Sequence, residues 1–152
     1  MSGSAQIVKN IIEELLDKLS VDAVIEVENT LNDCQFMVRT SEGGLLIGEN
    51  GKNLAAFHHL VKKISEKKFK EEENFSFSLD VNDYRLKIID ELKNFARLNA
   101  QRVRYFKKEI VLRPMTSFER RIVHEVLSDC PDITTESRGN EPCRQVVIKP
   151  YL

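Results

Sequence analysis

The sequence predicts an α+β protein of two small α/β modules joined by a long helix. Over residues 5–81, apolar residues recur with the periods of a helix, two strands, a helix and a strand. A helical period then runs from Asp83 to about Lys108. At about 1.5 Å per residue this helix spans about 40 Å, long enough to leave one module and enter another. A strand, a helix and two more strands follow.

The first module is predicted from apolar spacing and turns. Helices are expected over residues 5–19 and 51–67, and strands over residues 21–28, 34–40 and 75–81. In the last strand Phe77 and Leu79 alternate with Ser78 and Asp80, which predicts one buried face and one solvent-exposed face. We expect the charged segment 66–74 to be an exposed loop or a frayed helix end. Asn82 is expected to cap the long helix.

The second module is predicted from a helix start signal between strands. A short strand over residues 109–112 is expected to close at Arg113 and Pro114. Thr116 and Glu119 are three residues apart and form a capping box, so a helix is expected over residues 117–128. Strands are expected over residues 133–138 and 145–149, with a turn at 139–142.

Composition excludes several classes of protein. The 152 residues contain no apolar run of about 18 residues, the length that a membrane-spanning helix needs. The sequence also shows no secretory leader, in which a charged segment is followed by an apolar one. We therefore expect a cytoplasmic protein without an integral membrane segment. The cysteines, Cys34, Cys130 and Cys143, lack Cys-x-x-Cys spacing, and His58 and His59 are adjacent, so their side chains diverge on a helix. No metal site and no cofactor is predicted.

Charge is segregated along a chain whose net charge is only −1. Residues 1–82 carry 9 Lys or Arg and 14 Asp or Glu, whereas residues 83–152 carry 14 and 10. The segment from Arg97 to Arg121 contains eight basic residues and only two acidic ones, Glu109 and Glu119. This local excess is the electrostatic signature of a nucleic-acid surface, although a solvated helix face gives the same pattern.

One glycine pair is placed like a phosphate-binding turn. Gly48 and Gly51 end an apolar run and open a helix, with Glu49 and Asn50 between them and Lys52 after them. Without a Cβ, glycine permits a sharp turn and close approach of a foreign sugar-phosphate chain. We expect amides at the helix start to face the anion, and Lys52 to add a positive charge. Glu49 should repel phosphate. The alternative interpretation of the glycine pair is a plain turn between two helices without a binding role.

A second group of candidate residues lies on the predicted helix 117–128. Helical spacing places Phe118 and Ile122 on an apolar side, and Arg120, Arg121 and His124 on a polar side. A guanidinium beside an imidazole offers donors to phosphate and a flat surface for a base. A solvated helix face remains the alternative. From the basic stretch before this helix, Arg104 and Lys108 are added as candidate contacts.

These motifs resemble two known domains. Ile47, the Gly-x-x-Gly turn and Lys52, followed by apolar residues at helical spacing, resemble a KH domain, whose loop clamps about four nucleotides of a single strand. The segment 115–124, with Thr135-Glu136-Ser137 and Arg144–Ile148, resembles the R-three-H domain, named for its Arg and His. Together they are similar to the Jag (SpoIIIJ-associated) family of bacterial RNA-binding proteins, many of which carry a further small N-terminal domain that these residues lack.

The resemblance implies a KH-like domain at 1–82, a connecting helix at 83–108 and an R-three-H-like domain at 109–152 that takes its first helix from 83–108. It also implies binding of single-stranded RNA, or single-stranded DNA, by a non-catalytic post-transcriptional regulator. No carboxylate is placed beside His124 for phosphodiester cleavage. The alternative is a protein-interaction scaffold in which the KH-like module binds a second KH domain or another copy of the chain, and RNA binding is weak.

Overall fold

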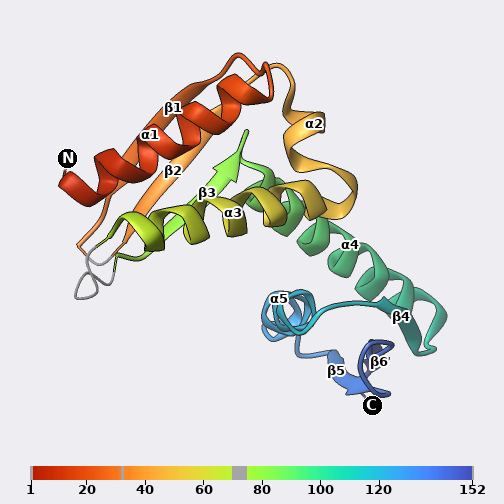
Figure 1. Ribbon diagram of the computed structural model, residues 1–152. Helices are drawn as coiled ribbons and strands as arrows, with labels where there is room; N and C mark the ends of the chain where they lie inside the picture. The colour runs from red at the N-terminus through yellow and green to blue at the C-terminus, as the bar shows by residue number, and fades with distance from the viewer. Residues whose placement is uncertain (1, 32, 70–74, 152) are drawn as a thin grey trace. The chain divides into compact units, whose positions relative to one another are not determined.

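The computed structural model describes residues 2–31, 33–69 and 75–151. The chain divides into two compact units, residues 1–84 and 85–152. The α+β class is confirmed, because each unit combines helices with a sheet (Figure 1). Of the charged segment predicted to be a loop or a helix end, residues 66–68 belong to a helix, and residues 70–74 lie outside the described residues.

The first unit consists of helices on a mixed sheet. Its elements are α1 (Gly3–Lys18), β1 (Val24–Asn29), β2 (Cys34–Arg39), α2 (Gly43–Ile47), a 3₁₀ turn (Glu49–Gly51), α3 (Lys52–Lys68) and β3 (Phe77–Val81). The sheet order is β1-β2-β3, with β1 antiparallel and β3 parallel to β2. A parallel pair needs a crossover connection, which α2 and α3 provide. Helices α1 and α3 lie side by side over the sheet (Figure 1).

Two predictions for this unit are wrong in detail. Asp80, expected on the solvent-exposed face of β3, is only 3% exposed, and its Oδ1 accepts a hydrogen bond from the Val81 amide at 2.9 Å. Asn82, expected to cap the long helix, instead binds the backbone of Thr40, with Nδ2 to the carbonyl at 2.8 Å and Oδ1 to the amide at 3.0 Å. Asn82 has φ +50°, a left-handed conformation that asparagine tolerates better than most residues. It thereby ties the residue after β2 to the residue after β3.

The second unit packs helices on an antiparallel sheet. Its elements are α4 (Tyr84–Phe106, whose first residue closes the first unit), β4 (Ile110–Pro114), α5 (Ser117–Leu127), β5 (Ile133–Arg138) and β6 (Gln145–Pro150). The strand order is β4-β6-β5. Strand β4 continues through Pro114 instead of ending at Leu112, with a register shift between Val111 and Pro114. The predicted capping box of α5 is confirmed: the Glu119 amide donates to Thr116 Oγ1, and the Thr116 amide donates to a Glu119 carboxylate oxygen.

The core of the second unit uses one face of α4, one side of α5 and one face of the sheet. Helix α4 contributes Leu92, Ala96, Ala100 and Val103 at spacings of three and four residues, which keeps one stripe of the helix buried. The other face of α4 is open to solvent. Among the described residues, no helix is both long and apolar enough to cross a membrane.

Candidate nucleic-acid interface

The turn between α2 and α3 has a left-handed backbone at several positions. Gly48 has φ +71°, Asn50 has φ +53° and Gly51 has φ +75°. Glycine adopts these angles without steric cost, and asparagine is among the few other residues that do so readily. The sequence Gly-Glu-Asn-Gly therefore matches the backbone that it must adopt. Its middle residues, Glu49 and Asn50, and the following Lys52 are exposed.

The two glycines are required by the packing of the protein itself. A Cβ on Gly48 would collide with the side chain of Asn53, which donates from Nδ2 to the Leu45 carbonyl at 3.0 Å. A Cβ on Gly51 would lie 2.9 Å from Cε1 of Tyr84. Asn53 and Tyr84 thus lie where Cβ atoms would stand at these two glycines, and the close approach of a foreign sugar-phosphate chain stays a prediction.

The backbone amides of the turn are also engaged within the protein. The Gly48 amide donates to the Gly44 carbonyl at 3.0 Å, and the Gly51 amide donates to the Gly48 carbonyl at 3.4 Å. The Lys52 amide donates to the Glu49 carbonyl. The predicted row of amides facing an anion is thus not present at these three positions. What the turn offers to a ligand is the group of exposed side chains at positions 49, 50 and 52.

Arg120 lies in a different place from the one predicted. It is 8% exposed, and its guanidinium donates to the Met115 carbonyl at 2.6 Å and to Glu141 Oε1 at 2.5 Å. Phe118, expected to be buried, is 59% exposed. The buried residues of α5 are Arg120, Ile122, Val123 and Leu127, so Arg120 joins the predicted apolar side and Phe118 leaves it. Glu141, in the turn between β5 and β6, supplies the charge partner that makes burial of Arg120 tolerable.

His124 joins the same helix to β5. Its Nδ1 lies 2.6 Å from Thr135 Oγ1, and its Nε2 lies 2.9 Å from Ser137 Oγ. Thr135 and Ser137 are two residues apart in a strand and so point to the same face. A neutral imidazole has one donor and one acceptor, and rotating hydroxyls can match both. Burial, and then the positive charge of Arg120, lower the pKa of His124.

The other basic residues predicted to contact RNA differ in whether they form an ion pair within the protein. Arg104 forms a two-pronged ion pair with Asp132, at 2.6 and 3.2 Å, and this contact lowers the pKa of the Asp132 carboxyl. Arg121 is exposed but pairs with Glu125 at 3.3 Å. Lys108 is exposed, and no ion pair is found for it within the described part of the chain.

The basic excess between residues 97 and 121 is therefore smaller than the sequence indicates. Ion pairs hold Arg104, Arg113, Arg120 and Arg121, with Asp132, Glu119, Glu141 and Glu125 respectively. For the remaining basic residues no acidic partner lies within 4.0 Å among the described residues; these are Arg97, Arg102, Lys107 and Lys108. Within the segment 97–121 the positive charge without an acidic partner thus lies on the second half of α4 and on the two residues after it.

Sequence reasoning missed the partners that hold both sites in place. Tyr84 and Asn53 are adjacent to the glycine turn only in space, and nothing in the spacing of residues indicated them. Glu141 was predicted only as part of a turn. For Thr135 and Ser137 a signal did exist, since two hydroxyl residues alternate in a predicted strand. No group of three or more His, Cys, Asp or Glu residues that could hold a metal occurs among the described residues.

Comparison with known proteins identifies both units. A KH domain matches residues 7–106, well over half of the chain, and an R-three-H domain matches residues 86–150. The two matches overlap on α4. The fold and these matches define a protein class in which a KH domain is followed by an R-three-H domain. The chain belongs to the Jag family, the class of KH and R-three-H proteins that its motifs resemble.

Several relatives align with most of this chain. The RNA-binding protein KhpB of Clostridium symbiosum is 30% identical over 139 residues, covering 90% of this chain and 62% of the relative. The protein of the same name from Lactiplantibacillus plantarum is 32% identical over 134 residues, covering 88% and 41%. That of Bacillus subtilis is 28% identical over 139 residues, covering 90% and 66%. The chain thus spans less than two thirds of the length of each.

Gly51 and Gly44 provide a matched test of the turn. Gly51→Ala should lower the free energy of unfolding by about 1 to 3 kcal/mol, because alanine is strained at positive φ and its Cβ meets Tyr84. Gly44→Ala, in α2 with no atom within 4 Å of its Cβ, should be neutral or stabilise by up to about 1 kcal/mol. Urea denaturation followed by circular dichroism measures both. Equal effects at the two positions would show that the turn geometry is misassigned.

Arg120 should matter for stability, which its neighbour Arg121 should not. Arg120→Ala removes two charge-assisted hydrogen bonds from a buried site, and we expect a loss of about 2 to 3 kcal/mol in the free energy of unfolding. Arg121→Ala is the matched control, with an exposed side chain and an expected change within about 0.5 kcal/mol. If both variants unfold at the same urea concentration as wild type, Arg120 has no structural role.

The lowered pKa of His124 makes the stability of the second unit depend on pH. In the unfolded chain the imidazole titrates near its reference pKa of about 6.5, so below that pH the unfolded state binds more protons than the folded state. Stability should therefore be complete above about pH 7.5 and decline as the pH falls through about 6.5. His124→Gln should flatten this decline. An equal slope in wild type and in His124→Gln would contradict the assignment.

Proposed function

We propose that the protein binds single-stranded RNA without catalysing a reaction on it. The observation that carries the proposal is the turn Gly48–Lys52, whose backbone is fixed by left-handed angles and internal hydrogen bonds while Glu49, Asn50 and Lys52 project into solvent. A fixed turn with outward polar side chains binds a ligand at low cost in conformational entropy. The family membership and the name that its relatives carry, RNA-binding protein, support the same function.

Within the turn we assign different roles to the three exposed residues. Lys52 contacts phosphate, because its ammonium is a mobile point charge beside the turn. Asn50 offers both a donor and an acceptor and so suits the edge of an unpaired base. Glu49 opposes phosphate binding and holds the affinity of this site down. Gly48 and Gly51 act by fixing the backbone.

In the second unit we propose a division of labour among the predicted residues. Lys108 and Arg121 contact the RNA backbone, Arg121 after giving up its exposed pair with Glu125. Arg104 stays with Asp132. Arg120 and His124 act indirectly, since they hold α5 against β5 and the turn that follows it. This unit would comprise the domain 109–152 together with α4, which supplies its first helix, and the KH domain would comprise residues 1–82.

The absence of catalysis is proposed from the state of His124. Both of its ring nitrogens are occupied by hydroxyl groups of the protein itself, Thr135 at 2.6 Å and Ser137 at 2.9 Å. Neither nitrogen is therefore poised to move a proton to or from a phosphodiester. We further propose a post-transcriptional role in the bacterial cytoplasm, supported by relatives from several bacteria that bear the name RNA-binding protein.

One observation favours a second function, that of a protein-binding scaffold. Glu49 is exposed at the tip of the turn, and residues 1–82 carry a net charge of −5, which is unfavourable for RNA. Fluorescence anisotropy with a labelled pool of single-stranded RNA at about 50 and 200 mM salt separates the two functions, because release of counterions makes RNA binding fall steeply with salt. A matching DNA pool shows whether the 2′-hydroxyl is recognised. Absence of binding to either pool would favour the scaffold.

Charge reversal at Glu49 tests the role of the turn. Glu49→Lys should tighten binding of single-stranded RNA and steepen the plot of log affinity against log salt by about 0.7 for one added phosphate contact. Asn50→Asp, which keeps the size and tolerance of positive φ, should weaken binding. Glu14→Lys, an equal charge change at an exposed site on α1, is the matched control. If Glu14→Lys tightens binding as much as Glu49→Lys, only the net charge matters and the turn is not the site.

A further inference from the structure

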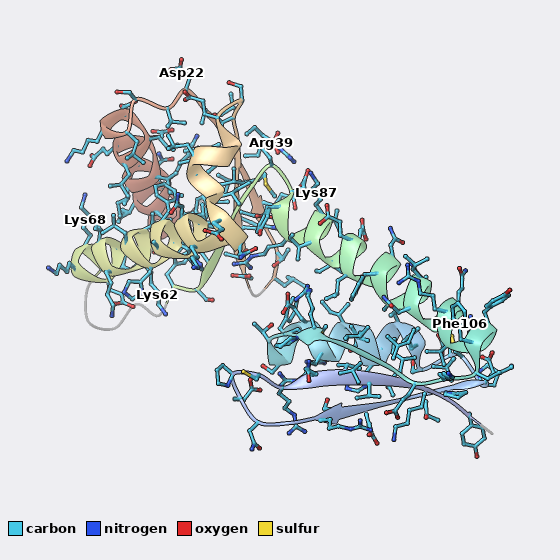
Figure 2. The ribbon with its side chains drawn as sticks, turned by 90° about the vertical axis from the view of Figure 1, so that its right-hand side faces the viewer. Asp22, Arg39, Lys62, Lys68, Lys87 and Phe106 are labelled. Carbon is cyan, nitrogen blue, oxygen red and sulfur yellow. The ribbon has the colours of Figure 1, made fainter. Side chains whose placement is uncertain are left out.

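The last turn of α4 exposes two aromatic rings side by side. Tyr105 is 82% exposed and Phe106 is 62% exposed. Their ring centroids lie 5.0 Å apart with an angle of 85° between the ring planes, an edge-to-face pair. Phe106 lies at the opposite end of α4 from Lys87 (Figure 2). The core of the second unit uses the other face of this helix, through Ala100 and Val103, so it leaves the rings uncovered.

The surroundings of the rings are positive. From Leu92 to Lys108 the sequence has no acidic residue and six basic ones. Two acidic residues at this end of α4 are held in ion pairs: Asp132 pairs with Arg104 of the helix, and Glu109, three residues after Phe106, pairs with Arg138 at 3.4 Å. The ligand that suits this patch is therefore an anion.

The basic side chains bracket the two rings. Arg102 precedes Tyr105 by three residues and Phe106 by four, so on the helix it shares their side. The helix ends at Phe106, and the next residue, Lys107, has φ +57° and donates its amide to the Val103 carbonyl at 2.9 Å. This bond fixes the point at which Lys107 and Lys108 leave the helix, next to the rings.

We propose that Tyr105 and Phe106 form a base-stacking subsite for single-stranded RNA, with Arg102, Lys107 and Lys108 holding the flanking phosphates. The inference rests on the proposed function and names a contact within it. Aromatic faces bind unpaired bases of any sequence, whereas bases in a duplex are already stacked on one another. A protein partner that matched the rings would also have to be strongly acidic. A single-stranded polynucleotide carries both features in one chain, because each nucleotide has an apolar base face and a phosphate anion.

The test uses the full chain and two RNA probes of equal charge. One is an oligouridylate of about 12 nucleotides, within the range of about 4 to 16 that one module covers, and the other is its abasic counterpart. The double variant Tyr105→Ala with Phe106→Ala should bind the oligouridylate about tenfold or more weakly, and the abasic strand as wild type does. Phe118→Ala, which removes a ring that is 59% exposed on α5, should leave both affinities unchanged.

Two further variants separate stacking from charge. Lys107→Gln with Lys108→Gln should weaken both probes and reduce the slope of log affinity against log salt by about 1.4, or about 0.7 for each phosphate that is no longer neutralised. The chain contains no tryptophan, so Tyr105→Trp introduces a single indole reporter at the subsite. Its fluorescence should change on addition of the oligouridylate and stay constant with the abasic strand.

Several results would overturn the proposal. If the double alanine variant binds the oligouridylate like wild type while the lysine variant is weakened, RNA binding stands and the stacking subsite is wrong. If sedimentation shows that the double variant only converts a wild-type dimer to a monomer, with RNA affinity unchanged, the rings are a contact between copies. If wild type binds neither probe, the proposed function itself fails. Circular dichroism must first show that each variant unfolds at the same urea concentration as wild type.

Discussion

The hydrogen bonds that α5 makes through Arg120 and His124 are the constraint on which the second unit depends. Arg120 reaches the Met115 carbonyl before the helix and Glu141 in the turn after β5, and His124 reaches two hydroxyls on β5. One helix thereby fixes the segment that enters it and the hairpin that follows. A lysine could not replace Arg120, because the planar guanidinium directs donors to two acceptors in different directions. The Arg and His after which the R-three-H domain is named therefore stabilise the fold of this unit.

The first unit solves a similar problem with neutral amides. Asn53 ties the start of α3 to Leu45 in α2, and Asn82 ties the ends of β2 and β3 together. Between them the glycine turn has little freedom, since each glycine faces a side chain of the protein. Rigidity of the turn and exposure of its middle residues follow from the same contacts. For the proposed RNA ligand the turn is a preformed surface, which lowers the entropic cost of binding.

Local patterns predicted the elements well and the burial of polar residues poorly. Strand β5 has the predicted bounds, and the capping box of α5 formed as expected, because both depend on residues a few positions apart. The short helix α2 was not predicted, since five residues carry too little periodicity. Arg120 was placed on the wrong side because the buried side of a helix is inferred from apolar residues, and a buried arginine with a distant partner breaks that rule. Glu141, 21 residues away, could not be identified as that partner from sequence.

The same limit applies to the electrostatic reading of the sequence. A count of basic residues measures charge before folding, whereas a ligand meets the charge that remains after internal pairing. In the folded protein, acidic residues from elsewhere in the sequence form ion pairs with Arg104, Arg113 and Arg120. Ion pairing also neutralises Asp132 and Glu109 near the end of α4, and so leaves the neighbouring lysines without competitors. Internal ion pairs thus determine where on the second unit the remaining positive charge meets exposed aromatic rings.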